Sequence, residues 1–158
     1  MHRNDEFVRT TIQPALLGLI DGSLGSIAPV FAVALVTHHS YAAFIAGLAA
    51  ALGPAVSMGF SEALSDDGVL TGRGAPLWRG FVVGAGTFCG AIFHTLPFLI
   101  PHFTAAFIAA SLVVVAEIVV IALLRAAYFP TVGLWSSLGY MAVAGAAVLG
   151  VGLVLGVS

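Results

Sequence analysis

Five long stretches of the chain are almost wholly apolar, and short polar segments separate them. A helix needs about 20 apolar residues to cross the hydrocarbon core of a bilayer. The stretches are too long and continuous for β-barrel strands, in which polar and apolar residues alternate. The pattern therefore predicts an all-α integral membrane bundle of five transmembrane helices, at residues 14–36, 42–64, 78–100, 104–127 and 136–157.

Composition supports the same class of protein. Of 158 residues, 60% are hydrophobic and only 8% are charged, too few to cover a water-facing surface. No basic run suggests nucleic acid, and the single cysteine, Cys89, excludes an intrachain disulfide. Residues 1–13 are polar and mixed in charge, so we interpret them as a cytoplasmic or interfacial segment before one membrane domain at 14–158.

The arginines indicate the orientation. Positively charged residues are enriched in the cytoplasmic loops of membrane proteins. If the N-terminus is cytoplasmic, every arginine falls on the cytoplasmic side, and with five spans the C-terminus is outside. These arginines are Arg3, Arg9, Arg73, Arg79 and Arg125. We therefore expect a multi-pass protein with its N-terminus inside.

Glycines spaced four residues apart predict close contacts between helices. Such a pair places two small residues on one helix face, and close backbone contact stabilises membrane bundles because lipid supplies no hydrophobic drive between helices. The pairs are Gly18 and Gly22, Gly80 and Gly84, Gly86 and Gly90, and Gly152 and Gly156. We interpret them as packing positions.

Asp21 lies within the first apolar stretch, where a carboxylate has little water to solvate it. A charge near the bilayer centre costs roughly 2.5–3.5 kcal/mol on insertion scales. The predicted topology places Met58 of the second span at the same depth, with Glu62 one helical turn closer to the cytoplasm on the same face. The three side chains would line a route inwards from the cytoplasm, so we expect a functional site here.

These residue types favour a transition metal. Carboxylates alone suit Mg²⁺ or Ca²⁺, while a thioether favours softer ions, so the mixed set suits Fe²⁺ and its first-row neighbours. An aspartate that holds a proton when no metal is bound also meets the requirement for exchanging metal against protons. Taken alone, a methionine such as Met58 is more often a packing residue than a metal ligand. Glu62, taken alone, could be an interfacial residue whose side chain reaches water.

Four further residues are secondary candidates. Glu117, near mid-depth of the fourth span, is either a proton relay or pathway ligand, or a protonated side chain hydrogen-bonded to a facing helix. His94, towards the outer side of the third span, is either an exit-side ligand or a hydrogen-bonded packing histidine. Asp66 and Asp67 in the cytoplasmic link either attract cations or form a solvated turn.

Hydrolytic chemistry conflicts with the predicted depths. Ser57 and Ser61 lie in the cytoplasmic half of the second span, whereas His94 lies towards the outer side of the third. A serine nucleophile and its base must be within hydrogen-bond reach. We therefore expect a protein that is not an enzyme.

Several motifs together resemble the vacuolar iron transporter family. The main ones are Gly18-Leu19-Ile20-Asp21-Gly22, then Gly47-Leu48-Ala49, then Ser57-Met58-x-x-x-Glu62-x-x-Ser65. The run 61–68, Gly72-Arg73-Gly74, His94-Thr95-Leu96-Pro97 and Ile100-Pro101 are more similar to the membrane domain of the bacterial ferritin-like (rubrerythrin-type) fusion iron exporters. The resemblance covers nearly the whole chain.

The resemblance implies a homodimer of five-span subunits in a bacterial inner (plasma) membrane, with a metal route at the dimer interface lined by the first spans. Members of the family serve iron homeostasis by moving Fe²⁺, and sometimes Mn²⁺, out of the cytosol by proton antiport. The pathway residues of the family match Asp21, Met58 and Glu62. The resemblance also implies that no cofactor is permanently bound and that the metal is the transported substrate.

Two departures from the family pattern leave a second hypothesis for the function open. Plant-type members carry a Glu-rich helical domain between spans two and three, where this chain has only the link 65–77. The fusion members carry an N-terminal ferritin-like domain, where this chain has only a short segment before its first span. The alternative function is therefore a non-transporting membrane anchor or assembly module for a ferritin-like partner.

Overall fold

The computed structural model describes residues 3–65, 67–129 and 131–157, and this part of the chain is helical without strands. The all-α prediction is therefore confirmed. The elements are α1 (Arg3–Phe7), the π-helix η1 (Val8–Ile12), α2 (Gln13–Thr37), α3 (Ser40–Ser65), α4 (Pro76–Ile92), the 3₁₀ helix η2 (Leu96–Leu99), α5 (Phe103–Tyr128) and α6 (Leu134–Val157).

Four helices of the described chain are long and apolar enough to cross a bilayer, as expected of an integral membrane protein. They are Asp5–Thr37, Ser40–Ser65, Phe103–Tyr128 and Leu134–Val157. The first is longer than predicted, because α1 and η1 run directly into α2. Residues 3–13 of the N-terminal segment are therefore helical and continuous with the rest of α2.

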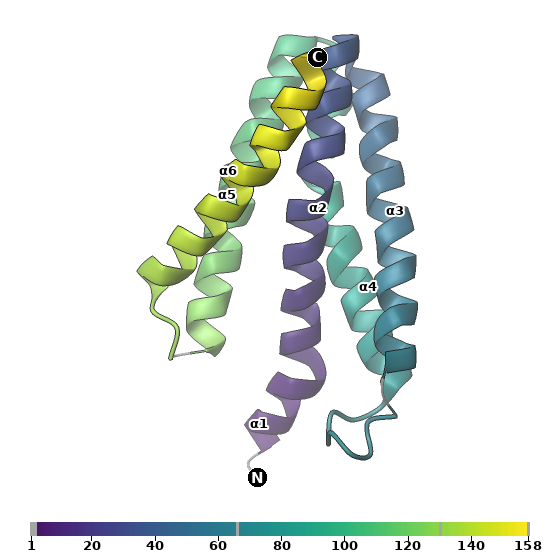
Figure 1. Ribbon diagram of the computed structural model, residues 1–158, viewed down its shortest axis with the longest axis vertical. Coiled ribbons are helices and arrows are strands. Elements are labelled where there is room, and N and C mark those ends of the chain that lie inside the picture. Colours follow the sequence, from purple (N-terminus) through teal and green to yellow (C-terminus); the bar gives the residue numbers. More distant parts are fainter. Residues whose placement is uncertain (1–2, 66, 130, 158) are drawn as a thin grey trace.

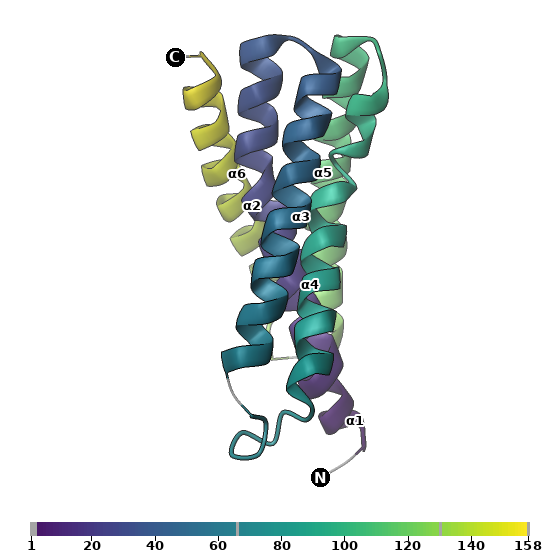
Figure 2. The same cartoon turned by 90° about the vertical axis from the view of Figure 1, so that its right-hand side faces the viewer.

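The third apolar stretch differs from the prediction of one helix over residues 78–100. α4 ends at Ile92, a turn follows, and η2 then continues towards α5 (Figure 2). Pro97 explains the break, since it has no N–H and disfavours helical conformation in the residue before it. The break places His94 and Thr95 in the turn, and both are fully buried.

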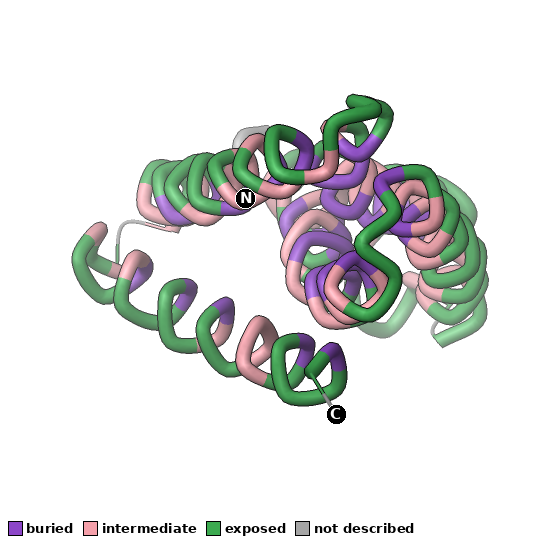
Figure 3. The backbone as a smooth tube through the Cα atoms, turned by 90° about the horizontal axis from the view of Figure 1, so that it is seen from above, coloured by how far each residue is buried: buried purple, intermediate pink, exposed green. Residues whose placement is uncertain are grey.

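The helices are arranged around α2, which packs against α4, α3 and α6 (Figure 1). Seen along the long axis, buried positions face the neighbouring helices and exposed positions cover the outer surface (Figure 3). Many of those exposed residues are large and apolar, including Leu112, Trp135 and Val143. An apolar outer surface matches a lipid environment.

The two ends of the bundle differ in the arginine and histidine residues that they carry. α1, the loop after α3 and the link between α5 and α6 lie at one end, and the C-terminus lies at the other (Figure 1). We call the first the arginine end, after Arg73, Arg79 and Arg125, and the second the histidine end, after His38 and His102. The helix order therefore collects these arginines at one end, as the predicted topology requires.

α2 and α4 cross with their backbones in contact, as the glycine pairs predict. A Cβ atom on Gly22 would collide with the backbone of Thr87, and one on Gly90 would meet the backbone of Leu19 and Ser23. Only hydrogen atoms fit at these crossing points. The contact fixes α2, with Asp21 and Ser23, against α4 and the turn that follows it.

Candidate functional site

Asp21 of α2 and Met58 of α3 line one cavity, with a volume of about 460 Å³. This agrees with the depth comparison made from the sequence. We call it the Asp21 cavity. Its remaining lining residues come from the same two helices and are Gly22, Gly25, Ser26, Pro29, Ala50, Pro54 and Ser57.

Two prolines leave backbone carbonyls without a helical hydrogen bond at residues that line the Asp21 cavity. Pro29 in α2 and Pro54 in α3 both lie inside continuous helices. Proline has no N–H, so the helical hydrogen bonds to the carbonyls of Gly25 and Ala50 do not form. Gly25 and Ala50 both line the cavity. Carbonyl oxygens released in this way bind cations in other membrane proteins.

The Asp21 cavity brings few metal-binding side chains together. The cavity combines one carboxylate, one thioether and the hydroxyl group of Ser57. Among the residues that the structure describes, no group of three or more His, Cys, Asp or Glu is placed to hold a metal ion. Further ligands for an ion at Asp21 must therefore come from backbone carbonyls, water or another chain.

Asp21 is exposed on the surface of the protomer. It borders a second hollow, between α2 and α6, that Leu17, Leu24 and Val148 also line. A carboxylate that faces lipid at this depth is costly. This face of α2 therefore needs a polar neighbour or a cover in the membrane.

Glu62 is held in ion pairs away from the Asp21 cavity. Its Oε1 atom lies 2.8 Å from Arg79 Nε and 2.8 Å from Arg73 Nη2. The Arg79 side chain is fully buried and also donates a hydrogen bond to the Gly74 carbonyl. The structure thus brings together Asp21 and Met58 but places Glu62 in a charged cluster at the arginine end.

Asp67, in the link after α3, is held in a local backbone turn. Asp67 accepts a hydrogen bond from the Val69 backbone, which is the arrangement of a solvated turn. Asp66 lies outside the described residues.

From the sequence alone, Arg79 was used only as a marker of orientation, although an arginine beside an apolar stretch signals a buried partner.

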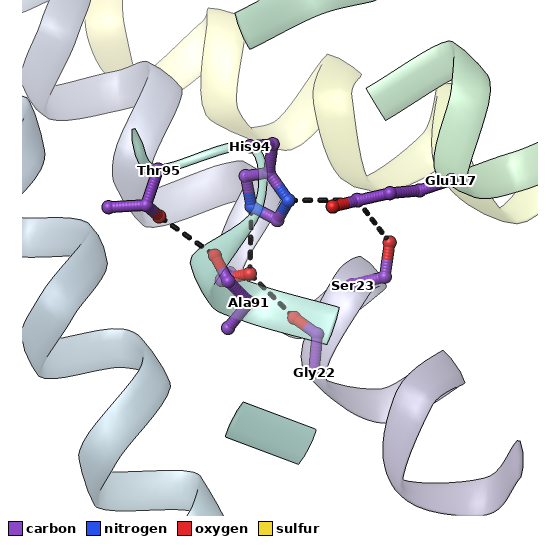
Figure 4. Close-up of polar contacts among 7 residues, drawn as sticks. Gly22, Ser23, Ala91, His94, Thr95 and Glu117 are labelled. Carbon is purple, nitrogen blue, oxygen red and sulfur yellow. Dashed lines mark hydrogen bonds and ion pairs between the residues drawn. The ribbon is translucent and has the colours of Figure 1, made fainter. Parts of the chain in front are cut away.

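His94 and Glu117 form a second polar site inside the bundle (Figure 4). His94 Nδ1 lies 2.9 Å from Glu117 Oε2, and His94 Nε2 lies 3.0 Å from Ser26 Oγ. Ser23 donates a hydrogen bond of 2.8 Å to the same Glu117 oxygen. The site therefore joins α2, the turn after α4, and α5.

The turn after α4 holds His94 in place. Thr95 Oγ1 donates a hydrogen bond of 2.8 Å to the Ala91 carbonyl (Figure 4). The Thr95 side chain also packs closely against Gly47 of α3, where a Cβ atom would collide with it. His94 and Glu117 were each predicted as separate candidates, whereas Ser23 and Ser26 were missed. The sequence offered one weak indication of Ser23 and Ser26, because two hydroxyl residues three positions apart lie on the same face of a helix.

The fold and these sites define an all-helical integral membrane protein with a cavity between two helices, lined by a carboxylate and a thioether, and a buried histidine–glutamate pair. Comparisons with known protein families, with curated proteins and with solved structures find no match to this chain. Its activity must therefore be inferred from the sites themselves.

Proposed function

We propose that this protein moves a divalent transition metal, Fe²⁺ or Mn²⁺, out of the cytosol in exchange for protons. The observation that carries the proposal is that Asp21 and Met58 line one cavity. A hard carboxylate and a soft thioether in one site suit a first-row transition metal better than Mg²⁺ or Ca²⁺. The resemblance of the surrounding motifs to the vacuolar iron transporter family supports the same substrate.

The working unit in this proposal is a homodimer. A second copy placed against the exposed face of α2 would cover Asp21 and remove its contact with lipid. It would also bring a second aspartate and a second methionine, which completes a ligand set that one protomer lacks. Symmetric dimers bring the same surface of both subunits together. One face of α2 can therefore both shield Asp21 from lipid and complete the ligand set.

The proposed direction follows from the two ends of the bundle. With the arginine end in the cytoplasm, metal approaches from the end where Glu62 pairs with Arg73 and Arg79. A cation that binds Glu62 there must displace guanidinium groups already held by the carboxylate. Glu62 then receives the ion only when this cluster rearranges, and Asp21 and Met58 bind it in transit.

The proposal is tested by measuring Mn²⁺ and Fe²⁺ uptake into liposomes that contain the purified chain, with and without a pH gradient. Met58→Leu keeps the apolar volume but removes the thioether, and Asp21→Asn removes the charge. We expect both variants to lower uptake at least about tenfold, equivalent to about 1.4 kcal/mol.

Met141→Leu is the matched control, because Met141 is a buried methionine of α6 that does not line the cavity. It should transport like the wild type. Wild-type uptake at or below that of empty liposomes would refute transport and favour an anchor for a ferritin-like partner. Uptake by Asp21→Asn and Met58→Leu equal to that of the wild type would refute this site.

A further inference from the structure

The pair of His94 and Glu117 is connected to the Asp21 cavity through one side chain. Ser26 lines the cavity and its hydroxyl also contacts His94 Nε2. The Glu117 side chain is only 10% exposed and that of His94 is fully buried. The hydrogen-bonded chain Ser26–His94–Glu117 therefore runs from the cavity into the closed interior of the bundle.

One arrangement of the hydrogens satisfies all of these contacts. Ser26 Oγ is 2.5 Å from the Gly22 carbonyl, which can only accept, so the Ser26 hydrogen points there. Ser26 Oγ then accepts from His94, and His94 Nε2 carries a hydrogen. The contact of 2.9 Å between His94 Nδ1 and Glu117 Oε2 holds a further proton, on either atom. In this geometry the pair has no net charge.

A second arrangement has one proton fewer. If the Ser26 hydroxyl rotates from the Gly22 carbonyl to His94 Nε2, the imidazole keeps a hydrogen only on Nδ1 and donates it to an ionised Glu117. The pair then has a charge of one negative unit. Rotation of Ser26 thus accompanies the loss or gain of one proton, and every hydrogen bond except that to Gly22 is kept.

We propose that the His94–Glu117 pair holds a proton that this protein exchanges for the metal, with Ser26 as the relay to the cavity. This inference rests on the proposed transport function and assigns its proton site. Loading begins when Ser26 Oγ accepts a proton from a hydronium ion in the cavity, which leaves as water, and passes its own hydrogen to His94 Nε2. The hydrogen on Nδ1 moves to Glu117 Oε2, and the newly bound hydrogen points to Gly22.

The unpaired oxygen of Glu117 supports a site that cycles between the two states. Glu117 Oε1 is buried and has no hydrogen-bond partner within the described residues. An ionised carboxylate shares its charge with this oxygen, so the ionised state is costly without a compensating charge nearby. A divalent cation in the Asp21 cavity would supply that charge, so metal binding favours release of the proton and metal departure favours its return.

Few other titratable groups are placed to compete with the pair. α2 contributes Asp21, which faces the cavity, and α4 contributes Cys89. In α6 the titratable side chain is Tyr140, which lies against Arg125. Within the described chain, η2 has no titratable side chain, while Glu62, Arg79 and Arg125 lie towards the arginine end of α3, α4 and α5.

The first test detects the proton without relying on transport. Infrared difference spectra of the purified full chain, without metal, would follow the carbonyl band of protonated carboxyl groups as pH is raised. We expect a band that disappears in Glu117→Gln and shifts in Ser26→Ala, because Ser26 contacts the partner of Glu117. Adding Mn²⁺ at constant pH should diminish the same band. If no pH-dependent or Mn²⁺-dependent band is lost in Glu117→Gln, the pair is not a proton site.

The second test measures exchange in liposomes. We expect Glu117→Gln to lower pH-gradient-driven Mn²⁺ uptake and proton counterflow by roughly 100-fold, the lower end of what a positioned proton-transfer group contributes. His94→Gln should act in the same direction, and Ser26→Ala should shift the pH profile of uptake. Ser137→Ala is the control, because Ser137 is a buried serine of α6 outside this chain of contacts. It should match the wild type.

The outcomes separate the two proposals. If Glu117→Gln folds, transports Mn²⁺ and moves protons like the wild type, the proton-site inference is wrong and transport stands. If the wild type moves no metal but its Glu117 band responds to pH and Mn²⁺, the transport proposal fails and the paired proton site stands as a metal-sensitive acid.

Discussion

Arg79 of α4 is buried completely and is held 2.8 Å from Glu62 of α3. Removing one partner of a buried ion pair leaves an uncompensated charge. We expect Glu62→Gln to lower the free energy of unfolding by about 3 kcal/mol, the lower end for such pairs. Thermal unfolding in detergent measures the change.

Arg73 provides the comparison for this cluster, since it pairs with the same Glu62 oxygen but its side chain is 27% exposed. Arg73→Gln should cost about 1 kcal/mol or less, as exposed ion pairs do. Equal and small effects of Glu62→Gln and Arg73→Gln would show that the buried arginine does not depend on Glu62.

The crossing of α2 and α4 leaves no room for a side chain at Gly22. We expect Gly22→Ala to destabilise the bundle by about 1–3 kcal/mol, the usual cost of overpacking. Gly53→Ala in α3 is the control, because nothing lies within 4 Å of a Cβ atom at that position. It should be neutral or stabilising, since alanine favours helix over glycine. The crossing would be looser than described if both variants unfolded at the same temperature.

Pro54 leaves the Ala50 carbonyl without its helical hydrogen bond beside the Asp21 cavity. If this oxygen binds the metal, Pro54→Ala restores an N–H that competes for it. We expect Mn²⁺ affinity to fall about tenfold, which is about 1.4 kcal/mol. Titration calorimetry on the purified protein measures the change.

Pro76 is the matched control for Pro54, because it lies in the first turn of α4, where an N–H would have no helical partner in any case. Pro76→Ala should leave Mn²⁺ affinity unchanged. Unaltered affinity in Pro54→Ala would remove the Ala50 carbonyl from the ligand set.

The dimer proposal predicts that the same face of α2 meets its copy. In a Cys89→Ala background, Gly25→Cys places a thiol next to Asp21, at a position with open space around it. We expect spontaneous disulfide-linked dimers in membranes. Val143→Cys, on the exposed surface of α6, should remain monomeric under the same oxidation. Cross-linking at Val143 but not at Gly25 would place the interface elsewhere.

The sequence predicted the all-helical fold and most of the long helices, because both depend on simple periodicities. Apolar length located the helices, and counting depth along two antiparallel helices placed Asp21 level with Met58. The glycine spacing likewise predicted close contacts between helices, although not which helices meet. In each case the relevant residues lie on regular helices, where position in the sequence translates directly into position in space.

The polar pairs could not be predicted, because each depends on irregular backbone. His94 reaches Glu117 only because the chain turns after Ile92, and a helix through that region would orient it differently. Arg79 reaches Glu62 beneath a loop in which Gly68, Gly72 and Gly74 adopt positive φ angles. Neither turn has a periodic pattern that sequence reasoning can follow.

The central claim is that Asp21 and Met58 bind a transition metal together. The most direct measurement is anomalous diffraction from crystals of the protein soaked in Mn²⁺. The account predicts an anomalous peak in the Asp21 cavity, within bonding distance of the Asp21 carboxylate and in contact with Met58, that is absent from Asp21→Asn crystals. A peak elsewhere with the cavity empty at saturating Mn²⁺ would contradict it.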